Sequence, residues 1–486
     1  MQFKKILIAN RSEIARRVIR SAHECGYHTI ALASPHDGNA LYVREAGEFH
    51  ALAGNFPKES YLDHEQVLAI AKKTKTDAIH PGYGFLSENA VFSGECAKAG
   101  IKFIGPTPEA IELLGDKTKA RTLAKKLGVP TPSGTTEALK DESEAIEVAK
   151  KIGYPIMLKA AAGGGGKGMR IVEDESGIHE ALKRAKSEAL SSFGDDRVYI
   201  EKYITSPRHI EFQILADSHG NAIHLGEREC SIQRRNQKLI EESPSVVLTE
   251  EMRKEMGEAA ISLIHEAKYE GAGTVEFLVD EKGKYYFLEV NTRLQVEHPV
   301  TEFVTGIDLV REQFRIAEGE KLGLKQPDII VRGHSIEARI QAEDVWNDFL
   351  PSLGKISYVR HPGGAFVRND NALFSGLEVS GFYDSLLSKL IVWDIDRLKA
   401  ISRMKRALEE MRIVGVSTTI PFARFVMKNK TFQKGDLSTK FITEEFTPEV
   451  RDELRQNYIN KNAGAFLSVE AYLDKKRERR LFVGAK

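Results

Sequence analysis

The chain has 486 residues, with 70 lysines and arginines against 70 aspartates and glutamates, so its formal net charge at pH 7 is zero. This balance argues against a partner that selects a basic excess, such as nucleic acid or a membrane surface. Three scattered cysteines predict neither a disulfide framework nor a zinc site, and no apolar run is long enough to span a bilayer, so we expect a cytoplasmic protein of about two to four domains.

The first 115 residues alternate between strand and helix patterns. Strands are predicted at 5–9, 29–33, 77–80 and 101–104, and helices at 13–24, 64–73 and 108–128. The turn after the first strand, Asn10-Arg11-Ser12-Glu13, lacks the glycines that let a dinucleotide approach the backbone. We therefore expect an open, mostly parallel α/β sheet domain over residues 1–115, without a dinucleotide site.

A proline-rich break at 129–134 precedes a smaller α+β piece. Helices are predicted at 141–152 and 178–191, and strands at 155–160 and 169–172. These elements predict a small mobile lid over 116–204. Strand patterns at short spacing then predict a larger, mainly antiparallel domain over 205–447, and residues 448–486 read as a polar tail.

A glycine loop separates the two strands of the predicted lid. Residues 160–169 read Ala-Ala-Ala-Gly-Gly-Gly-Gly-Lys-Gly-Met, which offers unhindered backbone N–H donors and one cation for phosphate. Lys167 is not followed by Ser or Thr and a helix, so this is not a Walker loop. A flap that closes over a triphosphate fits the pattern. A structural hairpin tip is the alternative, which the entropic cost of four glycines disfavours.

Two strand patterns flank a turn at Lys282-Gly283, and in the register of that turn Glu276 faces Glu289. Asn291 lies on the same face. Opposed carboxylates repel unless a cation lies between them, and together with an amide oxygen they suit magnesium. A solvated face is the alternative, but the apolar neighbours of both carboxylates disfavour it.

Arg293, Gln295 and Glu297 share a face if this strand continues. A guanidinium, an amide and a carboxylate together can hold and deprotonate a small oxyanion. By itself the segment could be a surface strand. Residues 229–238 carry three cations in five residues, and by themselves predict a solvated basic strand.

Taken together, these residues resemble the biotin carboxylase family of ATP-grasp enzymes over about residues 1–447. The resemblance is carried by the following segments: 8–11, 80–89, 115–117, the glycine loop, 201–203, 207–209, 233–238, 291–302 and 337–344. It implies an ATP-grasp fold, and a reaction that joins bicarbonate to biotin at the expense of ATP through carboxyphosphate. The biotin is linked to a carrier protein.

The resemblance also implies three groups of site residues. ATP would be bound by Lys117, Lys159, Gly164, Gly165, Gly166, Met169, Glu201, Lys202, Ile204, His209, Gln233, Asn236, Leu278 and Leu437. Magnesium or manganese would be held by Glu276, Glu289 and Asn291. Bicarbonate and biotin would meet Tyr83, Lys238, Arg293, Gln295, Val296, Glu297 and Arg339. Among the catalytic residues Lys238, Arg293, Glu297 and Arg339, Glu297 resembles the base and Arg339 the partner of the biotin ureido oxygen.

Asn236 stands where many biotin carboxylases have His, and this residue together with segments 273–280 and 435–441 resembles the α chains of propionyl-CoA and acetyl-CoA carboxylases. No Ala-Met-Lys-Met biotin-attachment motif is present. We therefore expect the carrier and the carboxyltransferase on separate chains, and the resemblance implies a homodimer. The alternatives are the equivalent subunit of a two-chain pyruvate carboxylase, and a nucleotide-binding regulatory protein without turnover.

Overall fold

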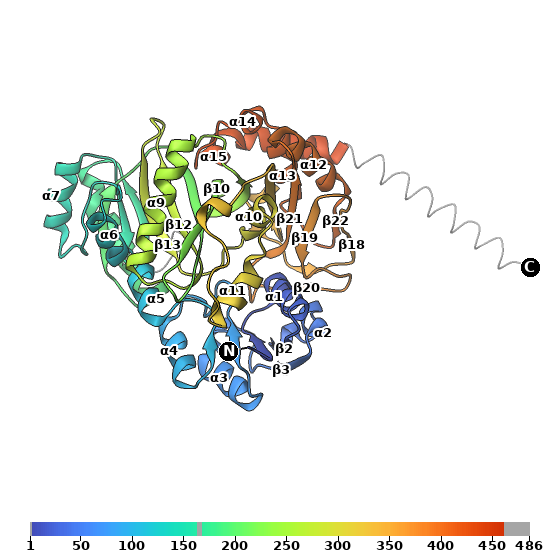
Figure 1. Ribbon diagram of the computed structural model, residues 1–486. Helices are drawn as coiled ribbons and strands as arrows, with labels where there is room; N and C mark the ends of the chain where they lie inside the picture. Colours follow the sequence, from blue (N-terminus) through green and yellow to red (C-terminus); the bar gives the residue numbers. More distant parts are fainter. Residues whose placement is uncertain (1, 163–167, 461–486) are drawn as a thin grey trace, which may run out of the picture.

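The N-terminal part of the chain forms an open parallel sheet, at the bottom of Figure 1. The computed structural model describes residues 2–162 and 168–460. The strand order is β3 (Glu48–Ala51), β2 (His28–Ala33), β1 (Lys5–Ile8), β4 (Ala78–His80) and β5 (Lys102–Phe103), with all neighbours parallel. Ile6, Leu7 and Ile8 are fully buried, because helices cover both faces of such a sheet. The α/β class predicted here is confirmed.

Five helices lie between these strands and after the last one: α1 (Ser12–Glu24), α2 (Leu41–Glu45), α3 (His64–Lys73), α4 (Ala90–Lys98) and α5 (Pro108–Gly115). Helix α1 buries Ile14, Val18 and Ala22 at helical spacing. The sequence pattern did not predict β3, whose residues are half-buried or exposed in alternation and so form no apolar run.

The sequence pattern predicts one helix over 108–128, but the structure has two. Helix α5 ends at Gly115 and α6 (Lys117–Lys126) begins two residues later, because Asp116 has an extended backbone with ψ 114°. The carboxylate of Asp116 accepts hydrogen bonds from the backbone of Thr118 and Lys119, which caps the new helix. The break places Lys117 at the start of α6.

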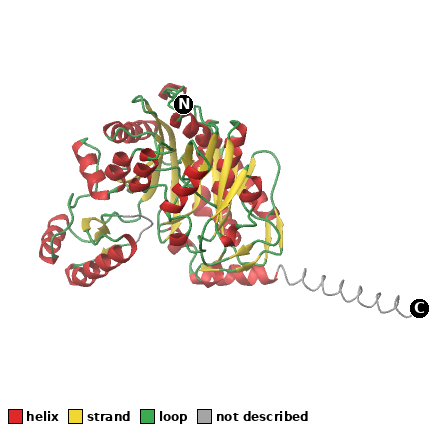
Figure 2. Ribbon diagram, turned by 90° about the horizontal axis from the view of Figure 1, so that it is seen from below, coloured by secondary structure: helices red, strands yellow, loops and turns green. Residues whose placement is uncertain are grey.

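The piece at the left of Figures 1 and 2 has its own small sheet and core. Its strands are antiparallel in the order β7 (Met169–Val172), β6 (Ile156–Ala160) and β8 (Val198–Lys202), and helices α7 (Glu142–Ile152) and α8 (Ile178–Phe193) pack on them. The predicted glycines Gly164, Gly165 and Gly166 lie outside the described residues. The division at 115/116, 204/205 and 447/448 stays a prediction.

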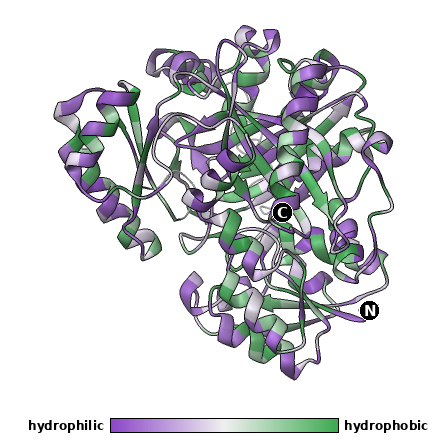
Figure 3. Ribbon diagram, turned by 60° about the vertical axis from the view of Figure 1, so that its left-hand side comes forward, coloured by the Kyte–Doolittle hydropathy of each residue, from purple (hydrophilic) through white to green (hydrophobic). Residues whose placement is uncertain are grey.

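An eight-stranded antiparallel sheet forms the centre of the molecule. Its order is β13 (Tyr285–Asn291), β12 (Gly271–Val279), β9 (Arg208–Ala216), β10 (Ala222–Arg234), β11 (Gln237–Ser243), β14 (His334–Gln341), β21 (Leu386–Asp394) and β19 (Val367–Asn371). Apolar residues gather on these interior strands in Figure 3. The sheet confirms the larger antiparallel region.

The two faces of this sheet differ in chemistry because side chains alternate along each strand. On one face Ile210, Phe212 and Ile336 join apolar clusters with the helices α9 (Glu250–Glu266), α12 (Arg397–Glu410) and α13 (Ile420–Lys428). On the other face the same strands carry His209, Glu211 and Arg339. The polar face adjoins α10 (His298–Thr305) and α11 (Leu309–Ala317), and α11 packs against the N-terminal sheet.

The remaining elements are short. They are β15 (Glu343–Asp344), β16 (Leu350–Pro351), β17 (Gly354–Lys355), β18 (Tyr358–Arg360), β20 (Glu378–Val379), β22 (Arg412–Val414), α14 (Lys430–Lys434) and α15 (Phe441–Glu445). Within the predicted polar tail, residues 448–460 are helical. Across the described ranges, no helix combines the length and apolar character needed to cross a membrane.

Candidate active site

Glu276 and Glu289 are paired directly opposite each other in the hairpin of β12 and β13, as predicted. The turn and the register that produce this pairing differ from those predicted. The turn is one residue longer than expected, since Asp280 pairs with Lys284 around residues 281–283. That turn alone would misalign the two carboxylates. A bulge between Glu276 and Phe277 shifts the register by one residue and restores the pairing.

Cations lie against both opposed carboxylates, which explains how the pairing is tolerated. Lys117 Nζ lies 2.8 Å from Glu289, and Lys238 Nζ lies 2.9 Å from Glu276, which His209 Nε2 also approaches to 2.9 Å. Asn291 donates to Glu276 at 2.9 Å. Burial opposes the charge on Lys117, but Glu289 outweighs it and raises the pKa of Lys117. Two carboxylates and one amide oxygen are the hard donors that a divalent cation shared with phosphate requires, so these residues fit magnesium.

Lys238 gathers three buried carboxylates on the polar face of the large sheet. Its Nζ lies 2.9 Å from Glu276 and 2.7 Å from Glu297, and it also bonds Glu211. A register shift between β10 and β11 turns Lys238 inward. Burial alone would lower the pKa of Lys238, but these carboxylates raise it well above its ordinary value. The prediction of a solvated basic strand over residues 229–238 is therefore wrong for Lys238, which is buried.

Glu297 is fully buried and joins Lys238 to Arg339, whose Nη2 lies 3.0 Å from its other oxygen. Burial opposes its charge, but Lys238, Arg339 and Arg228 hold the pKa of Glu297 well below its usual range. Glu297 is thus a carboxylate at neutral pH, clamped between two cations.

Strand β13 ends at Asn291, so the condition under which residues 293, 295 and 297 would share a strand face is not met. The side chains still converge, because the loop folds back before helix α10 begins at His298. Arg293 donates to Asn291 at 3.0 Å and to Gln295 at 3.1 Å, and Gln295 donates to Glu276 at 3.2 Å. A loop rather than a strand face assembles this part of the site.

Arg339 rests on a second carboxylate, Glu241, 2.5 Å from its Nε. Burial raises the pKa of Glu241 to about 7, although Arg339 opposes the shift. Glu337 is directly opposite Glu241 across β11 and β14, and neither of its oxygens has a hydrogen-bond partner among the described residues. Arg339 therefore contacts two buried carboxylates, Glu241 through its Nε and Glu297 through its Nη2.

A pocket of about 440 Å³ opens beside this cluster. Tyr83, Arg293, Val296 and Arg339, all predicted to meet bicarbonate or biotin, line it together. The Tyr83 hydroxyl donates to Glu13, while Lys389 Nζ donates to the carbonyl of Val296 at 2.9 Å. The pocket thus brings together residues of the N-terminal sheet domain and of the large antiparallel sheet domain.

The predicted nucleotide residues fall around the start of β9 and the small sheet. Lys159 pairs with Glu201, to which Arg121 also donates at 3.1 Å. Gln233 lies 3.4 Å from His209 Nδ1, and Leu278 is opposite His209 across the sheet.

The remaining residues predicted to bind the nucleotide are Lys202, Met169, Ile204, Leu437 and Asn236. The Lys202 ammonium donates to two backbone carbonyls, Gly153 at 3.1 Å and Tyr154 at 2.8 Å. Met169 and Ile204 are half-buried and Leu437 is buried. Asn236 is exposed in the β10–β11 turn at φ 65°, a conformation that Asn tolerates well.

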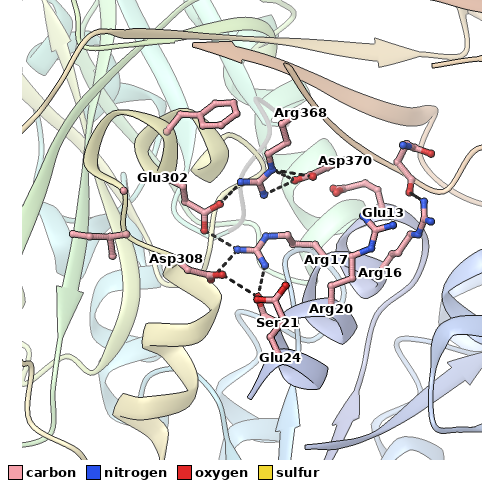
Figure 4. A pocket seen from close by; sticks show the side chains of 14 residues that line it. Glu13, Arg16, Arg17, Arg20, Ser21, Glu24, Glu302, Asp308, Arg368 and Asp370 are labelled. Atoms are coloured by element: carbon pink, nitrogen blue, oxygen red, sulfur yellow. Dashed lines mark hydrogen bonds and ion pairs between the residues drawn. The ribbon is translucent and has the colours of Figure 1, made fainter. Parts of the chain in front are cut away.

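A second pocket, of about 420 Å³, lies between α1 and β19. In Figure 4 Arg17 bridges Glu302 and Asp308, and Arg368 bridges Glu302 and Asp370. Glu13 lines this pocket and the first one, and Lys389 lies 3.3 Å from Glu13. Buried charges therefore run from one pocket to the other.

Sequence reasoning missed several supporting residues. Glu211 lies two residues from His209 on one strand face, so strand periodicity could have found it. Glu88, 2.8 Å from Arg293 Nε, belongs to segment 80–89, which is one of those that carry the family resemblance. The neighbouring sequence gives no indication that Lys389 and Arg228 belong to the site, because the residues they contact are remote in the sequence.

Three stretches of the chain match protein families. Residues 2–111 match "Biotin carboxylase, N-terminal domain", residues 116–325 match "Carbamoyl-phosphate synthase L chain, ATP binding domain", and residues 337–444 match "Biotin carboxylase C-terminal domain". The chain is 53% identical over 444 residues to the biotin carboxylase of Nostoc sp., covering 91% of this chain and 99% of the relative. It is 52% identical over 454 residues to a pyruvate carboxylase subunit of Methanothermobacter thermautotrophicus, covering 93% and 92%.

The fold of the chain is also similar to solved structures of biotin carboxylases. The biotin carboxylase domain dimer of Hydrogenobacter thermophilus 2-oxoglutarate carboxylase, in complex with MgADP, ADP and bicarbonate, has a TM-score of 0.90 at 48% identity, covering 91% of this chain and 98% of that one. A biotin carboxylase complex with β-γ-ATP from Campylobacter jejuni also has a TM-score of 0.90 at 48% identity, covering 91% and 99%.

Proposed function

Because the chain belongs to the biotin carboxylase family, we propose that it is the biotin carboxylase subunit of an acyl-CoA carboxylase built from several subunits. In this role it uses ATP and bicarbonate to carboxylate biotin on a separate carrier protein, and it is an ATP-dependent ligase. The observation that carries the proposal is the position of Glu297. It is clamped between Lys238 and Arg339, one contact away from Glu276 and beside the pocket of Tyr83.

Glu297 is the base of the first step. Lys238 is a buried cation among the carboxylates and Arg293 is a cation that lines the pocket, so together they attract bicarbonate and hold its negative oxygens. When bicarbonate takes over the contact with Lys238, Glu297 loses its strongest stabilising partner and its pKa rises. The freed carboxylate then accepts the bicarbonate proton as the oxygen attacks the γ-phosphate of ATP, the bond to the β-phosphate breaks, and ADP leaves. The product of this step is carboxyphosphate.

The charge on the phosphates is offset by Lys117 and Lys159, two cations that lie against carboxylates in the structure. Glu276, Glu289 and Asn291 would hold magnesium. When bound, the ion neutralises charge that develops on the phosphoryl oxygens. Met169, Ile204, Leu278 and Leu437 are proposed to contact the base of the nucleotide, and His209 and Gln233 the ribose.

Arg339 serves the second step. Carboxyphosphate releases CO₂ and phosphate in the closed site, and phosphate removes the proton from the biotin nitrogen. Negative charge then develops on the ureido oxygen, where the guanidinium of Arg339 can stabilise it, and the deprotonated nitrogen attacks CO₂ to form carboxybiotin. The contacts with Glu241 and Glu297 fix this guanidinium at the pocket before biotin arrives.

The test is the rate of ATP hydrolysis by the purified chain with magnesium. We expect slow hydrolysis, which bicarbonate and free biotin accelerate, with ¹⁴C-bicarbonate appearing in carboxybiotin. An ATPase rate that is unchanged by bicarbonate and by free biotin would contradict the assignment as a biotin carboxylase and would favour a nucleotide-binding regulatory protein.

We propose an acyl-CoA as the final carboxyl acceptor, because the sequences of segments 273–280 and 435–441, together with Asn236, resemble those of acyl-CoA carboxylases. The corresponding component of a two-chain pyruvate carboxylase is the second candidate, favoured by the 52% identity to the M. thermautotrophicus relative. Affinity purification of the chain from its native cell, followed by mass spectrometry of the biotinylated partner and the carboxyltransferase, decides between them. The homodimer is supported by the dimer named for the H. thermophilus relative. A cytoplasmic location stays a prediction, since plant relatives are chloroplastic.

A further inference from the structure

Aromatic side chains form a rim at the mouth of the first pocket. Phe382 lines the pocket, and its ring lies 5.1 Å from that of Phe56 and 5.8 Å from that of His36. Phe56 does not line the pocket, and 56% of its surface is exposed. We call Phe56, Phe382 and His36 the aromatic rim. Its outermost member is a large apolar side chain left in solvent at the entrance of a functional pocket.

The rim stands on a rigid base. Tyr383 adjoins Phe382 in the chain and packs against Tyr61 at 5.6 Å and Phe85 at 6.3 Å between ring centres. The guanidinium of Arg11 lies 4.0 Å above the Tyr383 ring. A preformed aromatic surface loses little conformational entropy when something binds to it, which is typical of binding surfaces.

Residues on two distant parts of the chain hold the rim in place. The backbone N–H of His36 donates to Asn55 at 2.9 Å, which fixes the loop before Phe56, and Phe382 reaches it from the connection between β20 and β21. Packing between these parts explains the buried side of each ring. It does not explain why more than half of Phe56 stays uncovered.

We propose that the aromatic rim is the docking surface for the folded carrier domain that delivers biotin, contacting an apolar patch beside its biotinylated lysine. This inference rests on the proposed function. A tethered biotin can reach Arg339 only if the carrier surface sits at the pocket mouth, within the length of the lysine arm. The rim is the apolar surface continuous with that mouth through Phe382 and Pro57, both of which line the pocket.

The test compares three forms of biotin: free biotin, ε-N-biotinyl-lysine, and the biotinylated carrier protein recovered with the chain. In F56A we expect kcat/KM for the carrier to fall about tenfold, mostly through KM, as for truncation of an interface anchor. The values for free biotin and biotinyl-lysine should stay within about twofold of the wild type, since Phe56 is outside the pocket. F56W should restore most of the carrier rate.

The matched control is F49A, because Phe49 on β3 is 55% exposed and is not among the pocket-lining residues. An F56A enzyme with wild-type carrier kinetics overturns the proposal. So does an equal loss with all three forms of biotin, which would mean that Phe56 only packs the protein together. A smaller molecular mass for F56A in sedimentation would instead assign the rim to contact between copies of the chain. Failure of the proposed function shows itself separately, as a wild-type enzyme that does not carboxylate free biotin.

Discussion

Arg339 and Glu297 are in direct contact, although they are 42 residues apart in the chain. The contact joins strand β14 to the loop that precedes helix α10. Arg339 also contacts Glu241 of the neighbouring strand β11 through its Nε, so its position is fixed by three segments. The base proposed for the first step and the cation proposed for the second are thereby held in one arrangement before any substrate binds.

Glu297→Gln should remove turnover and leave nucleotide binding intact. The amide keeps the shape of the side chain but cannot accept a proton, so bicarbonate-dependent ATP cleavage should fall by about 100-fold or more. The measurement is kcat for bicarbonate-dependent ATPase together with ATP affinity from fluorescence titration. A parallel loss of ATP affinity would remove Glu297 from the role of base.

Arg339→Lys should separate the two steps. Lysine keeps the charge but has one compact ammonium, which cannot reach Glu241 and Glu297 as the planar guanidinium does. We expect carboxylation of free biotin to fall by about 100-fold, and bicarbonate-dependent ATP cleavage without biotin to change by less than about threefold. Parallel assays of carboxybiotin and ADP check this, and an equal fall in both products would contradict it.

Glu289→Gln should raise the magnesium requirement. Loss of one of the two opposed carboxylates weakens the proposed ion site, so the magnesium concentration for half-maximal ATPase should rise about tenfold. The matched control is Glu281→Gln, an exposed carboxylate in the turn of the same hairpin. If both variants titrate with magnesium like the wild type, Glu289 is not a ligand.

Glu242 should make stability depend on acid pH. Burial opposes its charge, but the hydrogen bond from His334 at 2.7 Å and the contact with Arg397 at 2.6 Å lower its pKa from 4.5 to about 2. As pH falls, Glu242 therefore becomes protonated in the unfolded chain at a higher pH than in the folded protein. The stabilisation is complete above pH 4.5 and is lost as pH falls toward 2, and amounts to about 3 kcal/mol.

Glu242→Gln should consequently unfold more easily at pH 7, yet lose less stability than the wild type between pH 5.5 and pH 3.5. Urea midpoints at the two pH values measure this difference. Glu281→Gln serves again as the exposed control and should follow the wild type. A variant whose midpoint falls with acid as steeply as that of the wild type would show that another group controls the acid response.

Several features could be predicted from local sequence because their causes are local. Helix α3 begins and ends where its pattern predicts, with Asp63 as its cap. Strand alternation and a turn signal placed Glu276 opposite Glu289, although the bulge that produces this register left no trace that the turn rule could detect. The break at Asp116 was missed because the apolar spacing continues across it.

The sequence by itself determined the family, the chemistry of the donor groups and the alternation that puts them on one face of a sheet. Only the tertiary structure decided which charges meet. Lys238 faces Glu211, Glu276 and Glu297 because bulges shift β10, β11 and β12, and because a loop folds back before α10. Contacts of this kind join segments far apart in the chain, and a buried charge is stable only where such remote partners surround it. No local pattern encodes that arrangement, so it emerges only when the strands are paired.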